Sequence, residues 1–303
     1  MNSTTGSMSQ EADISSGKIS IEKPAQRLSL GRIDSAWALV LPIIIVVVLL
    51  YIVPLLYVFQ LSISDPKWGL DNYERLVTMR GQVRVMLTTF RISAISATLA
   101  VILGFLVALA MTWVRGVHQQ VLVICVMIPL WISVLVRGFS WLVLLRDNGP
   151  LNDWLMAVGL ITEPLAFVRN ELGVVIGMVH YLLPFAILPM YSVMQGIDER
   201  LLFASRSLGA SARTTFAKVY IPMALPGIMA ATIIVFVFGL GFYVTPVLLG
   251  GGRVVMLAES VSVSILTTAR WGLGAAQSMA LLAVTLCLVG ILSKTVGLKK
   301  GLG

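Results

Sequence analysis

Long apolar runs without a single charged side chain dominate this sequence. Six of them occur, and they cover residues 35–64, 92–114, 116–136, 172–197, 219–252 and 271–293. About 20 apolar residues, each rising 1.5 Å, cross a hydrocarbon layer of roughly 30 Å, so every run is long enough for a spanning helix. The pattern therefore predicts an all-α integral membrane protein with six transmembrane helices.

The segments outside these runs divide the chain further. Residues 1–34 are polar and rich in serine, which predicts a disordered N-terminal tail rather than a cleavable signal peptide. A six-span domain is expected over residues 35–297, and a short C-terminal tail over 298–303. Placing both termini in the cytoplasm leaves a small majority of the cations on the inside, which favours that orientation.

Composition supports lipid as the solvent of this chain. Hydrophobic residues make up 58% of it and charged residues only 12%, whereas a soluble domain carries roughly 25% charged residues. The net charge of +8 is therefore interpreted as cations that flank membrane spans and meet lipid, and no nucleic-acid partner is expected. The two cysteines, Cys125 and Cys287, lie in apolar runs and indicate neither a disulfide nor a metal site.

One polar stretch stands out between the fourth and fifth runs. Most of it lies in the segment FASRSLGASARTTFAKVYIPMALPG, which covers residues 203–227. We expect a cytoplasmic loop over residues 198–218, built from short helices interrupted near Gly209. Its apolar side chains are expected to rest on the bundle: Leu201, Leu202, Leu208 and Phe216. Small residues would leave one face flat enough for another backbone to approach closely. The plain alternative is an ordinary amphipathic helix at the membrane surface.

The spacing within this loop resembles the EAA loop of permease subunits from bacterial ABC importers. Phe203-Ala204-Ser205 is followed after three residues by Gly209, and nine residues later come Val219-Tyr220-Ile221-Pro222. Phe203 and Ser205 depart from the family pattern. GLDNY at 69–73, GPLN at 149–152, YLLPFAILPMYS at 181–192, GFYVTPVLLGGG at 241–252 and WGLGAAQS at 271–278 are similar to the spermidine/putrescine-type branch.

This resemblance implies a transport subunit rather than an enzyme. The loop would be a coupling helix docked on an ATPase subunit, formed by Ala204, Ser205, Arg206, Ser207, Leu208, Gly209 and Ala210. The implied partners are two ATPase subunits, a second permease (a homologue or another copy) and an extracytoplasmic solute-binding protein, in a bacterial inner membrane. The chain carries no G-x-x-x-x-G-K-[ST] phosphate loop, so no cofactor is expected on it, and ATP and Mg²⁺ would be bound by the ATPase partner.

A substrate path is expected among the third, fourth and fifth spans. Its candidate residues are Arg137, Trp141, Tyr181, Phe242, Tyr243 and Glu259. Arg137 either extends to the membrane surface or lies at the outer mouth of the path, and the rings either line a cavity or pack helices together. Glu259 is expected on a re-entrant or surface helix, because its stretch is too short to span.

The solute is less well defined by the sequence. The six runs hold no Asp or Glu, and Gly241-Phe242-Tyr243 stands where polyamine-type relatives carry GDF or GEF. A polyamine-like and an amino-acid-derived solute both stay open. An ion-coupled secondary transporter would need intramembrane carboxylates and inverted repeats, and a membrane enzyme would need clustered His, Asp or Glu; neither pattern is present.

Overall fold

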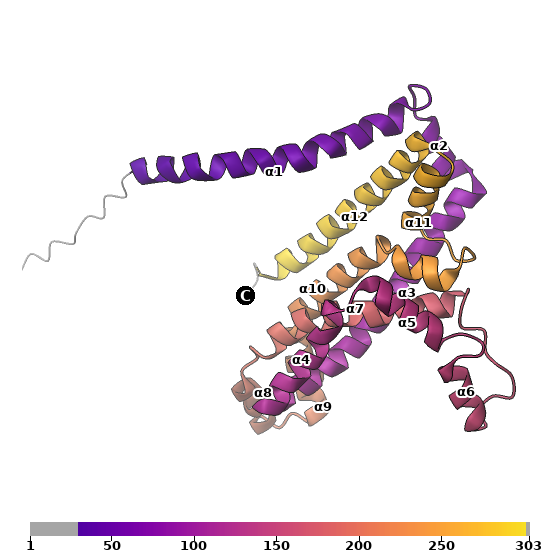
Figure 1. The fold of residues 1–303 in the computed structure, drawn as a ribbon. Helices are drawn as coiled ribbons and strands as arrows, with labels where there is room; N and C mark the ends of the chain where they lie inside the picture. Colours follow the sequence, from indigo (N-terminus) through magenta and orange to yellow (C-terminus); the bar gives the residue numbers. More distant parts are fainter. Residues whose placement is uncertain (1–29, 301–303) are drawn as a thin grey trace, which may run out of the picture. The chain divides into compact units, whose positions relative to one another are not determined.

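A computed structural model describes residues 30–300 of the chain, so the predicted tail segments before residue 30 and after residue 300 lie outside the described residues. This part contains helices and no strand (Figure 1). The α-helices are α1 Leu30–Ser64, α2 Asp71–Thr78, α3 Arg80–Trp113, α4 Val117–Trp131, α5 Val134–Leu144, α6 Pro150–Ala157, α7 Glu171–Met194, α8 Glu199–Ser207, α9 Ala212–Thr215, α10 Ile221–Leu240, α11 Leu257–Ser262 and α12 Trp271–Lys300. Three π-helical turns complete the set: η1 Phe216–Tyr220, η2 Pro246–Gly250 and η3 Val263–Thr267.

The number of membrane spans agrees with the apolar runs. Five helical stretches between residues 40 and 291 are long and apolar enough to cross a membrane, and the broken pair α4 and α5 makes a sixth if it counts as one span. The all-α transmembrane class is therefore confirmed.

The third span is not the straight helix over 116–136 that the charge-free run suggested. Helix α4 ends at Trp131, α5 begins at Val134, and the two axes differ by 96°. Pro129 lies in the last turn of α4, where it has no N–H to donate and restricts the residue before it. Both α4 and α5 are apolar, so hydropathy alone did not indicate the bend.

The fifth span also differs from its run over 219–252. It begins earlier, because α9, η1 and α10 join into one apolar helical stretch over Ala212–Leu240. It ends earlier too: the chain leaves the helix after Leu240, and η2 follows as a separate turn that closes at Gly251, with φ of 52°. The second half of the predicted loop is thus the first part of a spanning helix.

Helices α3, α7 and α10 pack against one another and form the main core. Small residues allow the close approach. A Cβ on Gly104 of α3 would lie 2.9 Å from Ala186 Cβ, and a Cβ on Gly227 of α10 would lie 2.9 Å from Val193 Cβ. Close backbone approach through small residues is the usual way for helices to gain packing contacts in lipid.

A second region of tight packing joins the segment around Ser62 and Asp65 to α2 and α12, and it explains two motifs of the sequence. Asn72 of GLDNY donates hydrogen bonds to the backbone oxygens of Ser62 and Asp65, at 3.1 and 2.7 Å. Gly272 of WGLG donates its N–H to the Asp65 carboxylate at 2.7 Å, and a Cβ there would lie 2.1 Å from the Asp65 carbonyl oxygen. Both motifs are therefore structural.

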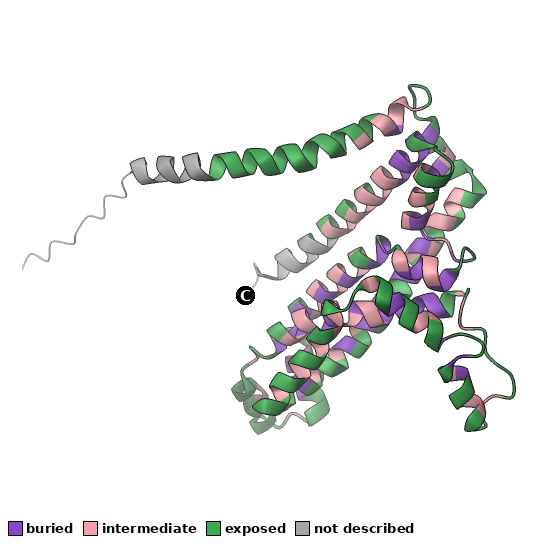
Figure 2. Cartoon of the chain, viewed as in Figure 1, coloured by how far each residue is buried: buried purple, intermediate pink, exposed green. Residues whose placement is uncertain are grey.

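The chain divides into two compact units, Met1–Val53 and Pro54–Gly303, and α1 crosses the boundary. All side chains of α1 from Val40 to Tyr57 are exposed, and Figure 2 shows this as an unbroken exposed stretch along the helix. An apolar helix with exposed side chains on all faces is expected where lipid or another membrane subunit covers it. Every site described below lies within the second unit.

Candidate functional site

The loop over residues 198–218 has a defined backbone. Helix α8 begins at an Asp198 cap, whose carboxylate accepts the N–H of Arg200 at 2.8 Å. It ends in a Schellman turn: the N–H of Gly209 bonds to the Arg206 carbonyl at 2.9 Å and that of Ala210 to the Ser205 carbonyl at 3.2 Å. Gly209 has φ of +87°, a conformation that side-chain-bearing residues rarely adopt. The predicted interruption near Gly209 is confirmed.

The apolar side chains of this loop do not all rest on the bundle as expected. Leu202 packs against the core of α3, α7 and α10. Leu208, by contrast, is 89% exposed, and Phe203 is 61% exposed. Leu201 is exposed as well. The correction has a geometric reason, because Leu208 is the C-cap of α8 and lies on the turn between α8 and α9.

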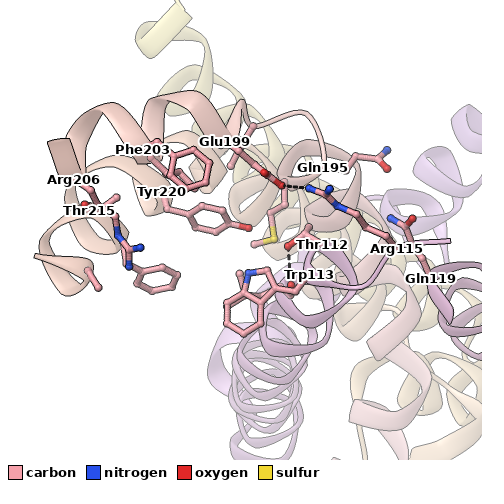
Figure 3. Close-up of a pocket in the computed structure, with 16 residues that line it drawn as sticks. Thr112, Trp113, Arg115, Gln119, Gln195, Glu199, Phe203, Arg206, Thr215 and Tyr220 are labelled. Atoms are coloured by element: carbon pink, nitrogen blue, oxygen red, sulfur yellow. Dashed lines mark hydrogen bonds and ion pairs between the residues drawn. The ribbon is translucent and has the colours of Figure 1, made fainter.

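A cavity of about 690 Å³ lies between this loop and the ends of α3 and α7. We call it the loop cavity. Trp113, Arg115, Glu199, Phe203, Arg206 and Tyr220 are among the residues that line it (Figure 3). The Arg115 guanidinium pairs with the Glu199 carboxylate at 2.7 Å, which ties the end of α3 to the start of α8. Both side chains are exposed, so this pair adds little to stability.

The loop is joined firmly to the span that follows it. Ser211 caps α9 by accepting the N–H of Thr214 at 3.2 Å, and Ser205 and Thr215 share a hydrogen bond of 3.0 Å across the turn. The ring of Phe216 stacks on that of Tyr220, with centroids 5.4 Å apart. Helices α9 and α10 and the turn η1 form one continuous helical stretch, so the loop leads into the α10 span without a break.

A second candidate site lies beside the break between α4 and α5. The Arg137 side chain is buried rather than extended to a membrane surface. One terminal nitrogen of its guanidinium donates to the Ile132 carbonyl at 3.0 Å, and its central carbon lies 4.8 Å from the centroid of the Tyr181 ring. Its Nε and Nη1 have no hydrogen-bond acceptor among the described residues.

Three of the predicted path residues line one cavity of about 410 Å³, which we call the aromatic cavity: Tyr181, Phe242 and Tyr243. Val134 of α5 and Phe238 of α10 also line it. The Tyr181 and Phe242 rings meet edge to face, with centroids 4.7 Å apart. The rings therefore do both things that the sequence left open: they pack against each other, and they line a cavity between α5, α7 and α10.

The remaining two candidates lie apart from this lining. Trp141 donates its indole N–H to Nδ1 of His180 at 3.0 Å, so its polar atom is already bonded inside the chain. Glu259 lies on the short helix α11, as expected, and is buried with one carboxylate oxygen unpaired. Burial raises the pKa of Glu259 above its ordinary value, and a hydrogen bond with the Met256 backbone partly opposes that shift.

Comparison with known proteins places this geometry in a family. Residues 100–296 match the family described as binding-protein-dependent transport system inner membrane component. The chain belongs to this family. The matched region holds the loop over 198–218 and both cavities of the permease.

The permease is similar to named polyamine permeases, as its motifs indicated. It is 30% identical over 220 residues to the spermidine/putrescine transport system permease protein PotB of Haemophilus influenzae, covering 73% of this chain and 77% of that one. It is 31% identical over 215 residues to PotB of Escherichia coli K12, covering 71% and 78%. These relatives are transport permeases, so neither an enzyme nor an ion-coupled secondary transporter is favoured.

Solved structures confirm the fold of the permease. A chain from a bacterial ABC transporter involved in the import of the acidic polysaccharide alginate superposes with a TM-score of 0.73 at 17% identity. The match covers 88% of this chain and 96% of that one. At this identity the similarity concerns the fold alone.

The sequence analysis did not predict the buried hydrogen-bond network around Gln277. Gln277 is fully buried and donates to Gln82 at 2.7 Å and to Ser260 at 2.9 Å, while its carbonyl oxygen accepts from Ser264 at 3.2 Å. It therefore joins α3, α11, η3 and α12. A lone Gln in the apolar run 271–293 was the available signal, since a polar side chain inside a span usually has a partner.

Proposed function

We propose that the chain is the translocation subunit of an ATP-driven importer and that the loop over 198–218 couples it to a separate ATPase. The exposed Leu208 and Phe203 carry this proposal. Two large exposed apolar side chains, Phe203 in the middle of α8 and Leu208 at its end, fit a protein partner, since a few side chains buried in well-packed pockets supply most of the energy of such interfaces. The Schellman turn presents them on a fixed backbone.

The structure of the loop gives this coupling a physical route. A partner that moves α8 moves Ser205, which is bonded to Thr215 at the head of the stretch leading into α10. A rigid element seated in a moving cleft is a common way to transmit domain motion. We infer a second permease, a homologue or another copy, because six spans are few for enclosing a gated path. Two ATPase subunits are inferred from the family resemblance.

For the solute, the relatives support a small organic compound, polyamine-like or amino-acid-derived. The two PotB proteins are named for spermidine and putrescine transport. One alginate transporter structure is described in complex with a pentasaccharide-bound periplasmic protein. By analogy, an extracytoplasmic binding protein would deliver the solute to this permease.

We further propose that both termini and Arg206 face the cytoplasm of a bacterial inner membrane, with Asp71, Asp153 and Glu259 on the other side. Arg206 and Asp153 are exposed in the described chain. Single cysteines at 206 and 153, in a background without Cys125 and Cys287, should react differently with an impermeant reagent added to intact cells. Labelling at 206 but not at 153 would reverse the orientation.

The coupling role is tested by a charge at the tip of the loop. Leu208→Asp should leave membrane insertion unchanged, because the native side chain is 89% exposed, but should reduce ATPase copurification and solute uptake. Leu160→Asp is a matched control, since Leu160 is 67% exposed in the segment between α6 and α7. If Leu208→Asp retained its ATPase and transported as the wild type does, the loop would not be the coupling element.

A further inference from the structure

The surroundings of Arg137 bear on the charge of the transported solute. The Arg137 side chain is only 7% exposed, yet it has neither an ion-pair partner nor an acceptor for Nε and Nη1 among the described residues. A buried cation of this kind is unfavourable unless an anion or further acceptors compensate it. Its one hydrogen bond, to Ile132, leaves those two donors free.

The broken helix adds positive potential at the same place. Helix α5 starts after Ser133, and no side chain caps its N-terminus. The first N–H groups of a helix and its dipole favour a negative charge, as at the half-helix termini of membrane transporters. Val134, the first residue of α5, lines the aromatic cavity. The uncapped helix start thus lies at the aromatic cavity, whereas Arg137 is not among the residues that line it.

The aromatic cavity has the size and walls of a small-solute site. Its volume of about 410 Å³ lies in the range typical of ligand pockets. Tyr181 forms its wall on the side of Arg137, whose guanidinium carbon is 4.8 Å from the ring centroid. The six apolar runs contribute no Asp or Glu, so a dication in this cavity would meet a cation and no carboxylate from the spans.

We propose that the aromatic cavity binds a carboxylate of the transported solute, with Arg137 as its counter-ion and the Tyr181 ring as the wall between them. Because the Tyr181 ring separates the two groups, the guanidinium would attract the carboxylate through its positive charge across the ring and not through hydrogen bonds. The substrate class is therefore an acidic or zwitterionic amine-type solute rather than a pure polycation. This inference rests on the proposed transport function, which it narrows.

Three four-carbon probes that differ in charge test it: putrescine, 4-aminobutyrate and succinate. Their binding to the purified permease–ATPase complex, without binding protein, can be measured by equilibrium dialysis with radiolabelled compounds at millimolar concentrations. We expect the two carboxylate probes to bind at least roughly tenfold more tightly than putrescine, because the buried cation across the ring attracts a carboxylate and repels a dication.

The variants separate a binding role from a structural one. Arg137→Gln should abolish the preference for carboxylates, whereas Arg137→Lys, which keeps the positive charge, should retain most of it. Arg146→Gln removes the same charge from an exposed position and should change nothing. If Arg137→Gln fails to assemble, the wild-type ranking and the Arg137→Lys variant decide the matter.

Contrary outcomes are equally clear. Putrescine binding as tightly as the carboxylates, no binding of any probe, or an unchanged ranking in Arg137→Gln would each overturn the proposal. None of these results depends on transport. ATP-dependent uptake in proteoliposomes with the binding protein tests the proposed function separately, so the two ideas can fail independently.

Discussion

At Gly209, a substitution can change the backbone conformation of the loop without creating a clash with neighbouring atoms of the chain. With φ of +87°, Gly209 holds the conformation that closes α8, and a Cβ built on it would meet nothing within 4 Å. A substitution there therefore acts within the chain only through the backbone. A β-branched residue in this left-handed region costs about 1–2 kcal/mol, which lowers the ratio of native to non-native turns roughly 5–30-fold.

Two substitutions exploit this difference. Gly209→Val should insert normally and lose most solute uptake and ATPase copurification, whereas Gly209→Asn should retain both, because asparagine tolerates positive φ. Uptake is compared at equal amounts of permease in the membrane. If Gly209→Asn fails as severely as Gly209→Val, the glycine is needed for close approach of the ATPase backbone. If Gly209→Val transports normally, the turn has no part in coupling.

Three further predictions concern the bundle and can be checked by thermal unfolding of the purified complex. Gln277→Leu should destabilise it by roughly 2 kcal/mol or more, because three buried hydrogen bonds are lost together; an unchanged midpoint would contradict this. Gly104→Ala should destabilise through the 2.9 Å approach to Ala186, while Gly81→Ala, with open space, should not. Burial raises the pKa of Glu259 in the folded protein above its ordinary value of 4.5. The neutral carboxyl therefore contributes fully to the free energy of unfolding below pH 4.5, and this contribution is lost as the pH rises through the raised pKa. Glu259→Gln should therefore gain stability over the wild type with rising pH, and parallel pH profiles would refute the argument.

Much of the architecture followed from the sequence alone. Transfer of apolar residues into lipid depends mainly on their number and on the absence of charge, so the six runs predicted the spans without any knowledge of their packing. The loop over 198–218 was equally visible, because it is polar between two apolar runs and Gly209 acts through the local backbone. The caps of its helices at Asp198 and Ser211 were not predicted and became apparent only in the structure.

Other features depend on which residues the fold brings together. The 96° bend after Trp131 is invisible in hydropathy, because both sides are apolar and neighbouring helices compensate the freed backbone groups. That bend places Arg137 over Tyr181, 44 positions along the chain, rather than at a membrane surface. Gln277 likewise acquires its role only when α3, α11 and α12 meet. Long-range contacts of this kind arise from packing, so only the tertiary structure decided the burial of Arg137, the lining of the aromatic cavity and the partners of Gln277.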